Sequence, residues 1–154
     1  MPGRRAGTFT PMERLPFVDE HAARLTASPE RTWDALVRVV RSDLSGGGLL
    51  ARALGARPGA RSGDWSGDPT GATLPGFAVA EAGRPTRLEL RGRHRFSSYA
   101  LVFLIDGETV RAQTWAAFPG LQGRVYRALV IGTRAHRLLV RRLLRHVAAT
   151  AAGR

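Results

Sequence analysis

The stretch GLQGRVYRALVIGTRAHRLLVRRLLRHVAAT, residues 120–150, decides how the rest of the chain has to fold. Apolar residues recur along it at alternating spacings of three and four, which predicts a helix with one apolar stripe. If helical throughout, it would be about 45 Å long, enough to cross a whole sheet. Gly132 on the stripe would allow the helix to approach the strands closely, or would mark a bend. The predicted stripe comprises Val125, Leu129, Gly132, His136, Leu139, Leu143 and Val147, and the other side carries Arg127, Arg134, Arg137, Arg141 and Arg145.

Taken alone, this stretch fits a nucleic-acid arm, a membrane-surface helix or the lid of a folded domain, and the strands before it favour the lid. Strands are predicted near residues 77–82, 85–96, 98–106 and 108–118, and Asp106-Gly107 joins the last two as a hairpin. Their alternation predicts an antiparallel sheet with one apolar face, which has to be covered. The residues expected on the covered face are Thr86, Leu88, Leu90, Gly92, His94 and Phe96 in one strand, and Val110, Ala112, Thr114, Ala116 and Phe118 in another.

The N-terminal part of the chain is expected to begin with a flexible arm, residues 1–16, followed by a strand over 17–27. A helix starts next, because Ser28 can cap its first N–H groups and Pro29 suits its first position. Residues 42–56 predict a turn and a short second helix, and the loop-rich segment 55–76 predicts a mobile gate or a hidden hairpin. The strand should turn His21, Ala23, Leu25 and Ala27 inward, and the first helix should turn Trp33, Leu36, Val37 and Val40 inward.

The composition indicates a single folded domain over residues 17–150, since 44% of the 154 residues are hydrophobic. The net charge of +12 attracts anionic partners, but all 24 basic residues are arginine, a pattern that also fits a coding bias. The absence of cysteine excludes disulfides and thiolate metal sites. No apolar run approaches the ~20 residues of a membrane span, so a cytoplasmic protein is expected.

The segment ARLTASPERTWDAL, residues 23–36, resembles the passage from first strand to first helix in the SRPBCC or START-like superfamily. The order of strand, helix, short helix, antiparallel strands and long C-terminal helix resembles the same superfamily, which includes lipid-transfer domains and polyketide cyclases. The resemblance implies an α+β helix-grip fold, in which a curved antiparallel sheet wraps around a long C-terminal helix and two short helices follow the first strand. It also implies a hydrophobic pocket between the sheet and the long helix.

Combined with the inward-facing residues, the resemblance predicts a site for a small hydrophobic molecule such as a lipid, an isoprenoid quinone or a polyketide-like compound. Apolar walls with a few polar groups are typical of such pockets. No metal or cofactor is predicted, because no pair of histidines or carboxylates has ligand spacing. The expected lining residues are Phe96, Thr114, Phe118, Val125, Leu129 and His136, with His94 as a polar contact.

Two other functions remain open at this stage. A polyketide cyclase-type enzyme would use the same pocket, with His94 or Thr114 assisting proton transfer. A basic adaptor would bind an anionic membrane surface or nucleic acid, although no aromatic residues are interleaved with the arginines for stacking on bases. No acid/base pair is expected from Glu89, which faces outward, or from Asp106, which lies in a turn. The candidate anion-binding surface consists of Arg134, Arg137, Arg141 and Arg145.

Overall fold

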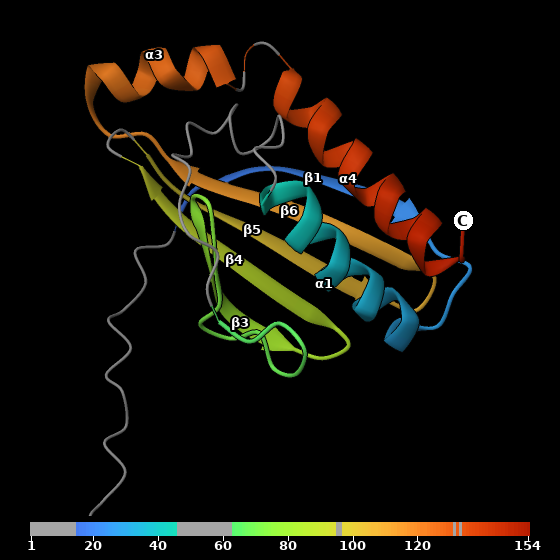
Figure 1. Cartoon of the computed structure of the whole chain (residues 1–154). Helices are drawn as coiled ribbons and strands as arrows, with labels where there is room; N and C mark the ends of the chain where they lie inside the picture. The colour runs from blue at the N-terminus through green and yellow to red at the C-terminus, as the bar shows by residue number, and fades with distance from the viewer. Residues whose placement is uncertain (1–14, 46–62, 95–96, 131, 133) are drawn as a thin grey trace, which may run out of the picture.

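One antiparallel sheet with helices packed on one face makes up the computed structural model (Figure 1), which describes residues 15–45, 63–94, 97–130, 132 and 134–154. The six strands lie in the order β1-β6-β5-β4-β3-β2. The strands are β1 Phe17–Arg24, β2 Thr73–Leu74, β3 Phe77–Gly83, β4 Arg87–His94, β5 Ser97–Asp106 and β6 Thr109–Ala117, and the helices are α1 Pro29–Ser45, α3 Gly120–Val130 and α4 Ala135–Ala151.

The predicted hairpin between β5 and β6 is present, and the geometry of its turn explains why a glycine stands at position 107. Asp106 pairs with Thr109, so two residues connect the strands. Gly107 is the first of them and has φ 53°, a left-handed conformation that glycine adopts without steric cost. The register then places Val110 opposite Ile105, and both side chains are buried. The hairpin therefore fixes which face of the two strands joins the core.

Helices α1 and α4 cover the apolar face of the sheet (Figure 1). The cap predicted for α1 is present, since the backbone N–H of Arg31 donates to Ser28 Oγ at 3.3 Å. A hydrogen bond between His146 Nδ1 and Asp43 Oδ2, at 2.9 Å, joins the two helices at the surface. The side chains that are almost fully buried in this core include Trp33, Leu36, Val40, Leu88, Leu90, Phe103, Val110, Val140, Leu144 and Val147.

The single helix predicted over residues 120–150 is wrong: the stretch forms two helices, α3 and α4. Arg134, the residue before α4, has φ 58° and ψ −1°, and a right-handed helix does not continue through a left-handed residue. The alternative reading of Gly132, as the mark of a bend, agrees with this position. Figure 1 shows α3 at one end of the sheet, while α4 lies across the sheet beside α1. Only α4 is therefore the lid that the apolar stripe predicted.

The second half of the segment predicted as a gate is anchored to the sheet. Trp65 is buried, and residues 73–74 form β2, a short strand paired with β3. The backbone N–H of Gly71 donates to Val79 O at 2.8 Å, which ties the preceding loop to the same strand. The first half of this segment, up to residue 62, lies outside the described residues. The same holds for residues 46–56 of the predicted second helix and for residues 1–14 of the N-terminal arm.

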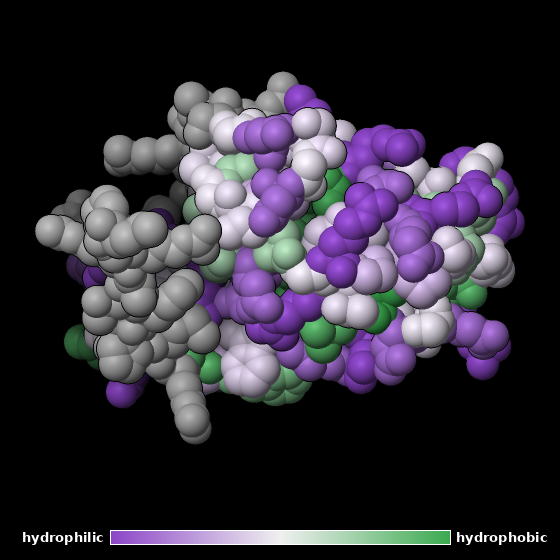
Figure 2. Space-filling model, turned by 90° about the horizontal axis from the view of Figure 1, so that it is seen from below, coloured by the Kyte–Doolittle hydropathy of each residue, from purple (hydrophilic) through white to green (hydrophobic). Residues whose placement is uncertain are grey.

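The architecture is that of a helix-grip fold, so the α+β prediction is confirmed. Figure 2, which views the molecule from below, shows hydrophilic and intermediate residues over most of that face, with small hydrophobic areas between them. Among the described helices, none combines the length and the apolar character needed to cross a bilayer.

Candidate functional site

A buried polar cluster lies where the first turn of α4 meets strands β1 and β6. Asp19 of β1 and Thr114 of β6 are direct partners in the sheet, and a register shift between Phe17 and Asp19 precedes this pair. His136 belongs to the first turn of α4, and its Nε2 lies 3.0 Å from Thr114 Oγ1 and 3.5 Å from Asp19 Oδ1. The side chains of His136 and Asp19 are only 5% and 11% exposed. The fold thus places an imidazole, a carboxylate and a hydroxyl together away from water.

The carboxyl group of Asp19 is held in its charged form. Burial alone would raise its pKa, but the contact with His136, the charge of His136, Thr114 and the charge of His21 together lower the pKa from 3.8 to about 2. Asp19 is therefore a carboxylate at neutral pH and can only accept hydrogen bonds. A proton on Nε2 of His136 is therefore favoured, because this N–H can point toward the carboxylate.

Two atoms of the cluster are buried and lack a hydrogen-bond partner within the described part of the chain, His136 Nδ1 and Asp19 Oδ1. A buried polar atom without a partner costs about 1–3 kcal/mol. Asp19 Oδ1 still lies 3.5 Å from His136 Nε2, whereas His136 Nδ1 has no hydrogen-bond partner among the described residues. The atom of the cluster that is left to bind a further group is therefore His136 Nδ1.

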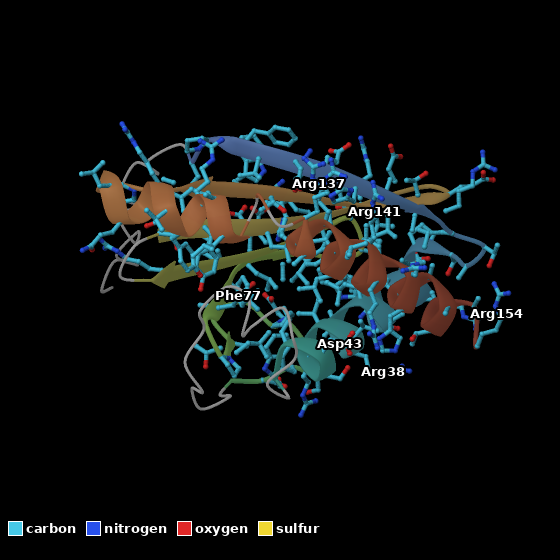
Figure 3. All side chains as sticks on the ribbon, turned by 90° about the horizontal axis from the view of Figure 1, so that it is seen from above. Arg38, Asp43, Phe77, Arg137, Arg141 and Arg154 are labelled. Carbon is cyan, nitrogen blue, oxygen red and sulfur yellow. The ribbon has the colours of Figure 1, made fainter. Side chains whose placement is uncertain are left out.

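A second layer of basic groups surrounds Asp19 closer to the surface. His21 Nε2 lies 3.3 Å from Asp19 Oδ2, and Arg141 Nε donates to His21 Nδ1 at 3.4 Å. Since Nδ1 accepts from Arg141, the proton of a neutral His21 is on Nε2, which then donates to Asp19. Arg137 is more distant, with Nε 3.9 Å from Asp19 Oδ2. Figure 3 shows both arginines projecting from α4 on the side of β1.

The structure brings together two of the predicted site residues and separates others. Thr114 and His136 are in direct contact, as described above. Phe118 is half-buried, and its ring lies 6.2 Å from that of Tyr126 on α3. The expectation that Val125 and Leu129 face inward is wrong, since they are 62% and 63% exposed. The reason is the division of the helix, which removes α3 from the stripe that α4 buries.

The other predicted site residues have different outcomes. Phe96 and the side chain of His94 lie outside the described residues. Of the candidate anion-binding arginines, Arg134 precedes α4 and Arg145 is exposed on it, while the remaining two contact the Asp19 cluster. The anion-binding role of these arginines stays a prediction.

Sequence reasoning missed Asp19, although a signal for it was present. Asp19 stands two residues before His21 in a strand whose alternation turns His21 inward, so the same alternation places Asp19 inward. The contact with His136 spans more than a hundred residues of sequence. No local pattern predicts such a pairing.

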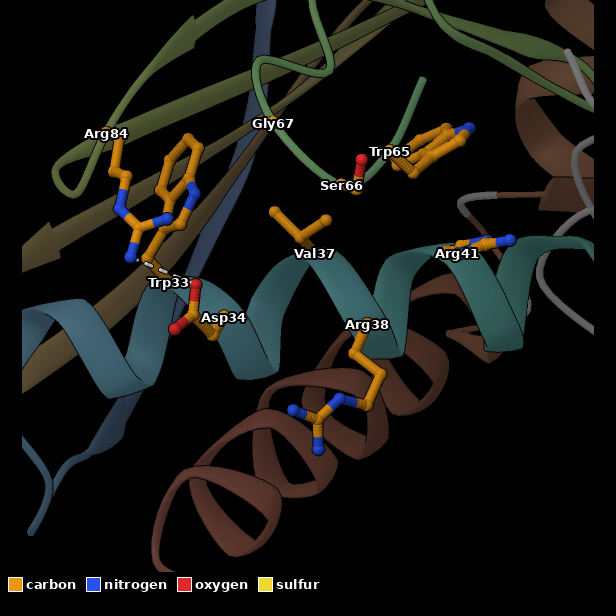
Figure 4. Close-up of a pocket in the computed structure, with 9 residues that line it drawn as sticks. All are labelled: Trp33, Asp34, Val37, Arg38, Arg41, Trp65, Ser66, Gly67 and Arg84. Atoms are coloured by element: carbon orange, nitrogen blue, oxygen red, sulfur yellow. Dashed lines mark ion pairs between the residues drawn. The ribbon is translucent and has the colours of Figure 1, made fainter. Parts of the chain in front are cut away.

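A hollow on the other side of α1 is less suited to a hydrophobic ligand (Figure 4). It has a volume of about 210 Å³, below the range of about 300–1,000 Å³ that is usual for ligand pockets. In Figure 4, Val37 points toward the Ser66–Gly67 loop, Arg38 points away from it, and Arg84 pairs with Asp34. Its lining residues are Trp33, Asp34, Val37, Arg38, Arg41, Trp65, Ser66, Gly67 and Arg84.

No family model matches the chain, and no curated protein matches it. The solved structures that match the chain include CalU16 and Cgl2372. CalU16 from Micromonospora echinospora has 16% sequence identity and a TM-score of 0.36, over 86% of this chain and 85% of that chain. The Polyketide_cyc-like protein Cgl2372 from Corynebacterium glutamicum has 12% identity and a TM-score of 0.39, over 91% of each chain. Similarity this low carries no ligand and no residue role to the present chain, so the site rests on its own geometry.

Proposed function

We propose that this protein binds a small hydrophobic molecule that carries a hydroxyl group, with the hydroxyl bound by His136. The observation that carries the proposal is His136 Nδ1, a buried polar atom without a partner in the described part of the chain. A bound ligand would provide the missing hydrogen bond and remove the cost of leaving this atom unsatisfied.

The expected polarity of the ligand group follows from the tautomer of His136. Because the ionised Asp19 can only accept hydrogen bonds, we assign the proton of the neutral imidazole to Nε2, the nitrogen that faces it. Nδ1 is then an acceptor, and its partner has to be a donor. A phenol or alcohol hydroxyl is a neutral donor that an otherwise apolar molecule commonly carries.

The surroundings of the cluster support an apolar ligand. Along β6, Ala116 follows Thr114 on the same face of the strand and is buried, and Phe118 comes directly after the end of β6. Tyr126 of α3 lies against Phe118 and is half-buried. A pocket between sheet and C-terminal helix, as the helix-grip resemblance implies, would therefore have one polar end at His136 and apolar or aromatic groups beside it.

The test compares two ligands that differ by one hydroxyl, 2-naphthol and naphthalene, titrated into the full chain and followed by NMR chemical shifts. We expect 2-naphthol to bind about fivefold to tenfold more tightly, the value of one hydrogen bond of about 1 kcal/mol. His136→Phe should remove this preference because it removes the acceptor and keeps an aromatic ring.

The matched control is Arg145→Gln on the exposed side of α4, which should leave the preference unchanged. Circular dichroism checks that each variant folds. Equal affinity of the wild-type protein for the two ligands, or a preference that survives in His136→Phe, would contradict the proposed role of His136.

The same geometry favours a second candidate function, proton transfer within a cyclase-type enzyme. An imidazole paired with a carboxylate is a competent general acid or base, and Nδ1 would be the atom that exchanges the proton with the substrate. The two functions differ in the fate of the ligand. Mass spectrometry of a molecule recovered after incubation would return it unchanged from a carrier and converted from an enzyme, and Asp19→Asn should slow the conversion.

A further inference from the structure

Helix α3 differs from an ordinary surface helix, because its large aliphatic side chains face solvent and not the core. Leu121, Val125 and Leu129 are 78%, 62% and 63% exposed. They are four residues apart, so they form one stripe along the helix. Gly123 lies on the opposite side and is buried. The side that α3 turns toward the rest of the protein carries Gly123 and the half-buried Tyr126.

The charged residues of α3, of α4 and of the segment between them are all basic. Residues 120–154 contain eight arginines and no aspartate or glutamate. Two of them, Arg124 and Arg127, are on α3 itself and are exposed. The next arginine, Arg134, precedes α4 and is also exposed. A surface that combines protruding aliphatic side chains with exposed arginines is complementary to one that is apolar inside and anionic outside.

We propose that α3 docks this protein onto an anionic lipid bilayer. Leu121, Val125 and Leu129 would enter the boundary between headgroups and acyl chains, and Arg124 and Arg127 would bind the lipid phosphates. Helices of this kind lie in the plane of the membrane, and their binding combines buried apolar area with attraction to anionic lipid. The end of the sheet at which α3 lies would then face the membrane (Figure 1).

Other partners explain only part of this surface. A nucleic acid would use the arginines but would gain little from three exposed aliphatic side chains. A stable protein interface buries about 800 Å² on each partner, which is more than one stripe on an 11-residue helix provides. The lipid surface uses both features at once. The proposal does not depend on a ligand at His136.

The experiment measures sedimentation of the full chain with vesicles of phosphatidylcholine alone and with vesicles containing about 30% phosphatidylglycerol. We expect binding to the anionic vesicles and at least about tenfold weaker binding to the neutral ones. The triple variant Leu121→Gln, Val125→Gln, Leu129→Gln should lose about tenfold or more of the anionic binding, because three side chains no longer enter the bilayer. These positions are exposed, so the variant should keep its unfolding temperature.

Each substitution has a matched control elsewhere on the surface. Phe17→Gln removes another exposed apolar side chain, 54% exposed, from β1 and should leave vesicle binding unchanged. Arg124→Gln with Arg127→Gln should weaken binding, whereas Arg38→Gln with Arg41→Gln removes the same charge from α1 and should have little effect.

Depth of insertion separates docking from simple attraction between charges. Val125→Trp should show a blue-shifted emission on anionic vesicles and quenching by brominated acyl chains beyond that of the wild-type tryptophans. The proposal is overturned if the arginine pair on α3 matters but the apolar triple variant binds as the wild type does. It is equally overturned if the triple variant changes the oligomeric state while the wild type ignores vesicles, because the stripe would then contact a second copy.

Discussion

At the scale of single residues, Asp19 links the site to the stability of the fold. Its pKa is about 2 in the folded protein against an ordinary value of 3.8, and at about 1.4 kcal/mol per pKa unit this corresponds to about 2 kcal/mol. Because the folded pKa is the lower one, this stability is fully present above the unfolded value. It is lost as the pH falls from about 4 through about 2.

The first prediction is that Asp19→Asn lowers the free energy of unfolding by about 2 kcal/mol at neutral pH. The difference from the wild type should shrink as the pH falls toward about 2, where the wild-type carboxylate is protonated as well. Urea unfolding across this pH range measures it. Asp106→Asn is the control, because that side chain is 80% exposed. A destabilisation that is independent of pH would show that Asp19 contributes through packing and not through its charge.

At the scale of elements, the junction of β4, β5 and the turn before β3 depends on a glycine. Gly92 pairs with Tyr99, and a Cβ at position 92 would collide with the Tyr99 ring and with the carbonyl of Gly76. The Tyr99 hydroxyl donates to that same carbonyl at 2.7 Å. The missing side chain is therefore what lets the Tyr99 ring lie across β4 and reach the turn.

The second prediction is that Gly92→Ala destabilises the protein by about 3 kcal/mol, the range expected for overpacking that also disturbs a buried hydrogen bond. Thermal unfolding measures the effect. Gly83→Ala provides the comparison, because a Cβ there would meet its nearest atoms at 3.8 Å, an ordinary contact. Equal unfolding temperatures for the two variants would mean that Tyr99 moves aside at little cost.

Elements with a strong local pattern were the ones that the sequence could predict. The predicted strand at 98–106 is observed at 97–106, and Asp106-Gly107 located the hairpin because two residues determine that turn. The helix at Ser28 was predictable because its cap is local. Such features depend on neighbours in sequence, and the chain shows them directly.

The division between α3 and α4 and the Asp19–His136 contact were beyond such reasoning for different reasons. The periodic stripe continues without interruption through Val125, Leu129 and His136. Such a pattern predicts which residues share one face of a helix, but it does not predict whether another element covers that face. The left-handed conformation of Arg134 could not be predicted from its residue type, because arginine is not a residue that favours this conformation. Asp19 and His136 are in contact because β1, β6 and α4 pack together. This contact depends on the complete fold, so no local sequence pattern predicts it.

At the scale of the whole molecule, repulsion between like charges opposes the compact state. The chain carries 24 arginines against 12 acidic residues, and its last 35 residues, 120–154, contribute none of the latter. The attractive pairs are of two kinds. Glu89, with a side chain 6% exposed, lies between Arg87 and Arg91, while the Arg84–Asp34 pair is more than half exposed. Salt weakens the repulsion and the exposed pairs, but it screens the buried pair much less.

Because an exposed pair contributes only about 0–1 kcal/mol, the loss of repulsion should exceed the loss of attraction as salt is added. The third prediction is therefore that raising NaCl from about 0.05 M to about 0.5 M increases the unfolding temperature by about 3 °C or more, equivalent to about 1 kcal/mol. Replacing the exposed Arg127 and Arg145 by glutamate lowers the net charge by four and should reduce this increase. A decrease of the unfolding temperature with salt would instead show that the exposed ion pairs, which salt weakens, outweigh the repulsion among the arginines.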